Sequence, residues 1–261
     1  MLNLAFSIQD FEYFLLVFTR ITAFFVTAPF FSTQNVPRRF KAGLGLFTAM
    51  LVYTFVVPHH ALAYNTVWGY GLLVLKESMA GAVLGLMTNL PLAILTFSGK
   101  LMDMESGLSM LNIFDPTTRV NEGFSGMLYH YMVLLILMIS GMHHYLIKAM
   151  VDAFELIPVG NVVFNYDMLP GMAMQFLTEY VGIGFRICLP IFGAILVTNV
   201  VLGINAKIAP QMNMFAVGIQ IKLLAGLTIM MIITITMPTV SSFIYEEIKK
   251  MMVVAVQIMS T

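Results

Sequence analysis

The sequence predicts an all-α membrane protein, and three observations carry that prediction. Of the 261 residues, 59% are apolar and 10% are charged, whereas an ordinary soluble domain has roughly 45–50% and 25%. The apolar residues also come in long uncharged runs. Strands of a membrane β-barrel would instead alternate apolar and polar residues, so the class is α-helical.

Five uncharged runs approach or exceed the roughly 20 residues that a helix needs to cross a bilayer. They cover residues 42–75, 78–99, 123–147, 187–206 and 223–245. A sixth stretch, 11–31, carries Arg20 within apolar sequence. With no repeat or low-complexity tract, we expect residues 1–261 to form a single helical membrane domain.

Several runs contain helix-breaking residues, so we expect broken or kinked helices whose freed backbone groups are covered by protein. These residues are Pro58, Pro91, Pro190, Gly193, Gly203 and Pro238.

The membrane topology stays open at this level. The positive-inside rule places the basic loop 38–41 and the pair Lys249 and Lys250 in the cytoplasm, which requires an even number of crossings between them. Five runs intervene. Either 42–75 makes two short passes around Pro58, or some runs do not cross. The acidic start of the chain, with Asp10 before its apolar run, predicts no cleaved signal peptide.

Composition argues against several functions. The formal net charge is zero and basic residues are scattered, so no nucleic-acid partner is expected. Cys188 is the only cysteine, which excludes an intramolecular disulfide and a multi-cysteine metal site. Adjacent His143 and His144 would project about 100° apart on a helix, a poor geometry for one metal ion.

No catalytic motif is present either. Asp152 and Glu155 have the spacing of a carboxylate pair, but general acid–base chemistry also needs a pocket and a partner. We therefore expect a protein that is not an enzyme and has no cofactor and no metal site. A membrane enzyme that uses these carboxylates or the histidines is the competing interpretation.

Charged residues inside apolar sequence are the first positive signal, because an arginine at the centre of a spanning helix costs about 2.5–3.5 kcal/mol. Arg20 and Arg186 qualify. Glu179 shares a helical face with Arg186, so the two form a candidate pair, although an arginine reaching the membrane interface is an equal alternative. Glu77, Gly81 and Gly85 share another face, where the glycines permit close helix approach.

The stretch 106–116, SGLSMLNIFDP, mixes small, polar and large apolar residues and ends on Asp115-Pro116, which favours a turn. Irregular backbone beside a membrane must be buried or line a cavity. The chain also has 23 methionines, whose flexible side chains suit either core filling or a deformable pore lining.

One block has a specific pattern. It runs from 186 to 222 and contains Arg186, Pro190, Asn199, Gly203, Lys207, the run Ala209-Pro210-Gln211-Met212-Asn213-Met214-Phe215, Gly218 and Lys222. Supporting positions are Arg20 followed by Ala28-Pro29-Phe30, Val36-Pro37 with Arg38, Glu77 with Gly81 and Gly85, and Gly99 with Asp103 and Gly107.

On these residues the chain resembles, nearly end to end, the FliR class of membrane components of bacterial flagellar type III protein export, which is related to an injectisome subunit. The resemblance implies a core subunit of the export gate in the bacterial inner membrane, at the flagellar basal body. It implies hydrophobic helical hairpins that pack with FliP-like and FliQ-like subunits around a central channel for unfolded flagellar proteins. FlhB-like and FlhA-like export components and membrane lipid are further implied partners.

The resemblance also implies roles for particular residues. The stretch after Gly107, within 100–122, would be a channel plug, with these candidate residues: Ser106, Gly107, Leu108, Ser109, Met110, Leu111, Asn112, Ile113, Phe114, Asp115 and Pro116. Subunit or helix packing would involve Arg20, Glu77, Gly81, Gly85, Arg186, Pro210, Asn213 and Lys222. A small-solute secondary transporter, which also uses broken helices with intramembrane charge, and an injectisome subunit are the alternatives.

Overall fold

The computed structural model describes residues 8–33, 36–56, 62, 64, 66–109, 123–211 and 213–260. Throughout these residues the secondary structure is helical, with no strand, which confirms the predicted all-α class. The chain divides into two compact units. Three helices, α3 (Val67–Ser106), α7 (Leu169–Ile208) and α9 (Met237–Met259), contribute residues to both. The single-domain expectation stays a prediction.

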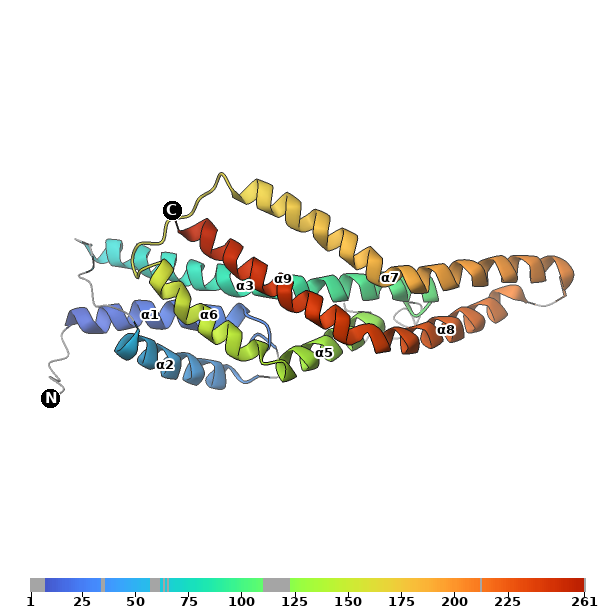
Figure 1. Ribbon diagram of the computed structural model, residues 1–261, viewed down its shortest axis with the longest axis horizontal. Helices are drawn as coiled ribbons and strands as arrows, with labels where there is room; N and C mark the ends of the chain where they lie inside the picture. The colour runs from blue at the N-terminus through green and yellow to red at the C-terminus, as the bar shows by residue number, and fades with distance from the viewer. Residues whose placement is uncertain are drawn as a thin grey trace. The chain divides into compact units, whose positions relative to one another are not determined.

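The first unit comprises Met1–Leu90, Gly141–Ala173 and Tyr245–Thr261. It contains α1 (Ile8–Thr27), α2 (Arg38–Phe55) and α6 (Met142–Leu156), together with parts of α3, α7 and α9. Helices α1 and α2 lie side by side (Figure 1). Its core is formed by fully buried residues that recur every three to four positions: Leu16, Val17, Ile21, Phe24 and Phe25 on α1, with Leu84, Leu146, Ile248 and Ala255 from the other helices.

The second unit comprises Pro91–Ser140 and Met174–Ile244. It contains α5 (Phe124–Ile139), α8 (Met214–Ile233) and the short 3-10 helix η1 (Thr234–Thr236), with the remaining parts of α3, α7 and α9. Helices α7 and α8 form a hairpin (Figure 1), and Leu202 of α7 lies beside Gly218 of α8. Buried apolar residues come from four helices: Leu92, Leu95, Met102, Val133, Leu137, Ile191, Ile195 and Met230.

Two of the prolines in the apolar runs do not end a helix. Pro91 and Pro190 lie inside uninterrupted helices of 40 residues each, α3 and α7. The observed breaks are at η1, directly before Pro238, and at Gly141, whose φ of 78° separates α5 from α6. Proline is well tolerated at the start of a helix, where its missing N–H is not needed, which explains Pro238 at the beginning of α9.

Three helical segments of the described chain are long and apolar enough to cross a membrane, namely Val67–Ser106, Leu169–Ile208 and Ala216–Met259. Helices α5 and α6 qualify only together, as a bent pair, which raises the number to four. Helices α1 and α2 fall short because each carries three charged residues. The run 42–75 is divided between α2 and α3, with Pro58 between them outside the described residues.

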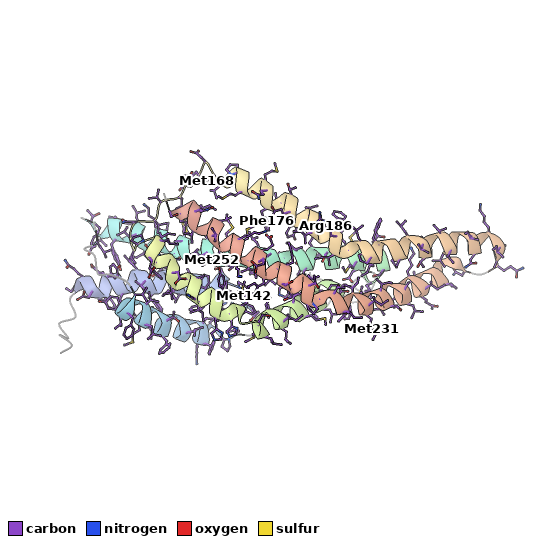
Figure 2. The ribbon with its side chains drawn as sticks, viewed as in Figure 1. Met142, Met168, Phe176, Arg186, Met231 and Met252 are labelled. Carbon is purple, nitrogen blue, oxygen red and sulfur yellow. The ribbon has the colours of Figure 1, made fainter. Side chains whose placement is uncertain are left out.

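The methionines occupy both environments. Met142 and Met252 are buried, whereas Met231 and Met168 are exposed, and all four are labelled in Figure 2. Core filling therefore accounts for some of them. Of the two exposed ones, Met231 lies on the outer surface of α8 and Met168 directly precedes α7.

Helices α1 and α3 approach each other closely at two glycines. A Cβ atom at Gly81 would lie 2.0 Å from the Arg20 carbonyl oxygen, and one at Gly85 would lie 2.0 Å from Thr27 Oγ1. The Asn89 side chain also donates a hydrogen bond to the Thr27 carbonyl at 3.3 Å. The absence of side chains at 81 and 85 allows this packing.

Replacing Gly81 by alanine should destabilise the first unit, because the new methyl group meets backbone atoms of α1 that have no room to move. Overpacking of this kind costs about 1–3 kcal/mol. The measurement is the midpoint of thermal unfolding of the protein purified in mild detergent. Gly71→Ala on the same helix is the matched control, since a Cβ there meets nothing within 4 Å. Equal midpoints for the two variants would contradict the close approach.

Candidate functional site: two buried polar clusters

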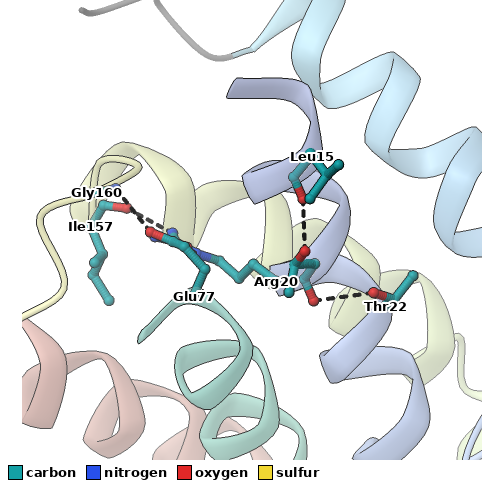
Figure 3. Close-up of polar contacts among 7 residues, drawn as sticks. Leu15, Arg20, Thr22, Glu77, Ile157 and Gly160 are labelled. Atoms are coloured by element: carbon teal, nitrogen blue, oxygen red, sulfur yellow. Dashed lines mark hydrogen bonds and ion pairs between the residues drawn. The ribbon is translucent and has the colours of Figure 1, made fainter. Parts of the chain in front are cut away.

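The first buried polar cluster joins α1 to α3 through an ion pair. Arg20 Nε lies 2.5 Å from Glu77 Oε2, and both side chains are 0% exposed. Arg20 Nη1 donates to the Ile157 carbonyl at 2.7 Å, and the Gly160 amide donates to Glu77 Oε1 at 2.8 Å (Figure 3). The pair therefore also holds the turn that follows α6.

The arginine of the ion pair also contacts an aromatic ring. Arg20 Cζ lies 4.5 Å from the centre of the Phe154 ring, a cation–π contact. Arg20 Nη2 is buried and has no hydrogen-bond partner among the described residues. A buried charge is tolerated only when it is paired and hydrogen-bonded, so Glu77 is the residue that makes Arg20 acceptable in this core. We conclude that this cluster holds α1, α3 and the turn after α6 together within the first unit.

The second buried polar cluster lies in the second unit, where α3 ends and α5 begins. The Ser125 amide donates to the Asp103 carboxylate, with distances of 3.2 and 3.3 Å to its two oxygens. The Ser125 hydroxyl also donates to Asp103 Oδ1. Asp103 is 2% exposed and Ser125 is fully buried. No ion pair joins Asp103 to a cation in the described ranges.

Helix α8 completes this second cluster. Ser125 Oγ lies 3.2 Å from Met230 Sδ, and the Tyr129 hydroxyl donates to the Met230 carbonyl at 3.4 Å. Ser106, at the end of α3, packs against Gly226, where a Cβ would come within 2.6 Å of Ser106 Cβ. We call the set Asp103, Ser106, Ser125, Gly226 and Met230 the Asp103 junction.

The Asp103 junction lies directly at the base of the predicted plug. Ser106 and Leu108 are buried, and Gly107 ends α3 with a φ of 83°, a conformation that favours glycine. Ser109 is half-buried. The other candidate plug residues, Met110 to Pro116, lie outside the described residues.

The remaining predicted packing residues are more exposed. Arg186 lies on α7 with an exposed side chain (Figure 2). The expected Arg186–Glu179 pair is not among the ion pairs of the described residues, and Glu179 instead accepts a hydrogen bond from Gln175 at 3.1 Å. Lys222 on α8 is half-buried.

The turn between α7 and α8 holds the last two predicted residues. Pro210 is exposed. Asn213 caps α8, since its Oδ1 accepts from the Ala216 amide at 3.4 Å. This is a common role for asparagine at a helix start.

Residues considered for chemistry are not assembled into a site. Asp152 and Glu155 are exposed on α6, and the rings of His143 and His144 are tilted by 42° with centroids 4.0 Å apart. Where the chain is described, no three His, Cys, Asp or Glu side chains are grouped to hold a metal. One cavity of about 150 Å³ is small for a ligand, and it is lined by Leu101, Met104, Glu105, Phe185, Cys188, Leu189 and Phe192.

The spacing of residues in the sequence did not identify the partner of Arg20 or the partner of Asp103. Glu77 is 57 residues from Arg20, and Ser125 is 22 residues from Asp103, so neither contact follows from helical periodicity. A signal for the second contact was available. The small residues of Gly123-Phe124-Ser125-Gly126 mark a helix start that another backbone approaches closely, and Gly126 indeed lies against Gly99 of α3.

Together these features define an all-helical, multi-pass membrane protein whose buried charged side chains hold helices together. Residues 11–258 match the family described as "Bacterial export proteins, family 1", and the chain belongs to this family.

The chain is similar to proteins named "Flagellar biosynthetic protein FliR". It is 32% identical to the one from Bacillus subtilis, over 83% of this chain and 84% of the relative. The Aquifex aeolicus protein is 30% identical, over 85% and 87%, and the Escherichia coli protein 25%, over 86% and 84%. The chain is thus an inner-membrane subunit of the flagellar type III export gate, as its resemblance implied. None of these relatives has the name of an enzyme.

Removing one member of the buried ion pair should be strongly destabilising. Glu77→Gln leaves Arg20 charged and unpaired in the core, at a cost of about 3–5 kcal/mol. The unfolding midpoint of the purified protein in mild detergent measures the loss. The double variant Arg20→Met with Glu77→Leu should lose less than Glu77→Gln alone, because it leaves no unpaired charge.

The matched control is Glu246→Gln, which removes a partner of Lys249 from an exposed pair with an N–O distance of 3.0 Å. Its midpoint should stay at the wild-type value, since exposed pairs contribute little. A Glu77→Gln midpoint as high as that of Glu246→Gln would show that the buried pair is not needed.

Proposed function

We propose that this export-gate subunit forms part of the central channel through which unfolded flagellar proteins pass, and that residues 106–122 form its plug. One observation carries the proposal. The helices that flank the segment meet at the Asp103 junction, where Asp103 of α3 contacts Ser125 of α5. A plug must stay attached at a fixed base while the polypeptide between its ends occupies the channel.

We further propose that FliP-like and FliQ-like subunits cover the apolar surfaces of α7, α8 and α9, with FlhB-like and FlhA-like components as additional partners. Of the most apolar 18 residues in each segment, 17% are buried in Leu169–Ile208 and 22% in Ala216–Met259. The exposed Arg186 and Pro210 and the half-buried Lys222 lie on these helices and the turn between them. We assign these three positions to contacts with the other subunits.

Helix length supports cover by protein as well as by lipid. Helices α3 and α7 have 40 residues each, which corresponds to about 60 Å of helix. The hydrocarbon core of a bilayer is about 30 Å thick. Lipid alone therefore covers about half of each helix, and neighbouring subunits would cover the rest.

Deleting residues 107–113 should loosen the closed channel and raise ion leakage across the inner membrane of cells that produce the complete gate. Leakage is measured as ion flux in growing cells. A variant in which 107–113 are replaced by an equal length of Gly and Ser is the companion. It should leak less than the deletion, since it preserves chain length. Unchanged leakage in the deletion variant, with normal amounts of protein in the membrane, would count against the plug.

The export role is proposed to involve no catalysis by this chain. Alanine at Asp152, Glu155, His143 and His144 should therefore leave the secretion of flagellar proteins into the medium unchanged. The first two side chains and His144 are exposed on α6, so their removal leaves no cavity. Selective loss of secretion with a normal protein level would favour the enzyme interpretation.

A further inference from the structure

We infer that Asp103 is the positioning residue of the plug. Its carboxylate fixes the start of α5 against the end of α3, and so it fixes the two helix ends to which the segment 108–122 is attached. This inference rests on the proposed function of that segment. It assigns a role to one side chain that neither the family match nor the names of the relatives provide.

The start of α5 depends on Asp103 because it has no cap of its own. Gly123 occupies the N-cap position and has no side chain to accept hydrogen bonds from the first free amides of the helix. Asp103 supplies this acceptor from another helix, through both carboxylate oxygens. A negative charge at a helix N-terminus is further stabilised by the helix dipole. The contact is therefore suited to a carboxylate and less suited to a neutral amide.

Two glycines make the contact possible. A Cβ at Gly99 would lie 2.1 Å from Gly126 Cα, and a Cβ at Gly123 would lie 2.0 Å from Asp103 Oδ2. Asp103 is four residues after Gly99 and so lies one turn further along the same face of α3. The close crossing at Gly99 brings the short Asp103 side chain within reach of the α5 amides.

Helix α8 shields the contact from water. Met230 Sδ lies beside Ser125 Oγ, and Gly226 covers Ser106. A hydrogen bond to a carboxylate is stronger in such a low-dielectric environment than in solvent. The helix ends on both sides of the segment are thus held by one buried interaction.

The test measures the separation of the two segment ends directly, in the assembled gate. Spin labels are placed at Ser109 and Phe124 in a chain whose single cysteine is changed, Cys188→Ala, and their distance distribution is recorded. Asp103→Asn should lengthen and broaden this distribution, because asparagine keeps one acceptor oxygen but places its NH2 group, a donor, where the second carboxylate oxygen accepts from the Ser125 amide. The same substitution without labels should raise ion leakage severalfold while the protein level in the membrane stays normal.

Matched variants separate positioning from general damage. Glu105→Gln removes the same charge two residues away, and no described contact joins Glu105 to α5, so it should change neither readout. Ser125→Ala removes one of the hydrogen bonds to Asp103 and should give a smaller effect of the same kind. This series keeps the test decisive if Asp103→Asn fails to assemble.

The outcomes distinguish this inference from the proposed function. An unchanged label distance in Asp103→Asn and Ser125→Ala overturns the positioning role. A changed distance without leakage, while the 107–113 deletion leaks, keeps the plug but overturns control of it by Asp103. If neither the deletion nor Asp103→Asn leaks, the plug itself is wrong and the inference falls with it. Changed distance together with leakage in both variants supports both statements.

Discussion

Close contact between helix backbones is the constraint on which both buried polar clusters depend. In the first unit Gly81 brings α3 against the backbone of α1, and this places Glu77, one turn earlier, beside Arg20. In the second unit Gly99 and Gly126 bring α3 against α5 and place Asp103 beside Ser125. Acidic side chains are short, so they reach a partner on another helix only where the axes are unusually near. Without the glycines, each buried charge would lack the group that compensates it.

The sequence predicted the helical class and the shared face of Glu77, Gly81 and Gly85, because composition and spacing along one helix are local properties. It did not predict the partner of Arg20, since a contact across 57 residues depends on how helices pack. Local spacing was misleading at Arg186, where Gln175 reaches Glu179. Proline positions alone did not show where helices end, because Pro91 and Pro190 lie inside helices that continue past them, as neighbouring groups in membrane proteins often permit.

The apolar runs of the sequence outnumber the candidate spans among the described residues for a physical reason. A run of apolar residues indicates a segment that avoids water, but it does not show whether lipid or protein covers that segment. Helix α1 illustrates this difference, since its residues Leu16, Val17 and Phe24 are fully buried inside the chain although the helix also carries three charged residues. Helix α7 is the opposite case, with an apolar surface that the chain itself leaves mostly uncovered.

The contact between Gly123 and Asp103 limits how this part of the chain is able to evolve. Any side chain at 123 would displace the carboxylate, because its first carbon already falls 2.0 Å from Oδ2. Aspartate is the shortest acidic residue, so no smaller residue at position 103 would make room for that side chain and still present a carboxylate to Ser125. A larger residue at 123 would require a new cap for α5 at the same time. A substitution at either position is therefore tolerated only together with a compensating change at the other, although the two lie 20 residues apart in the sequence.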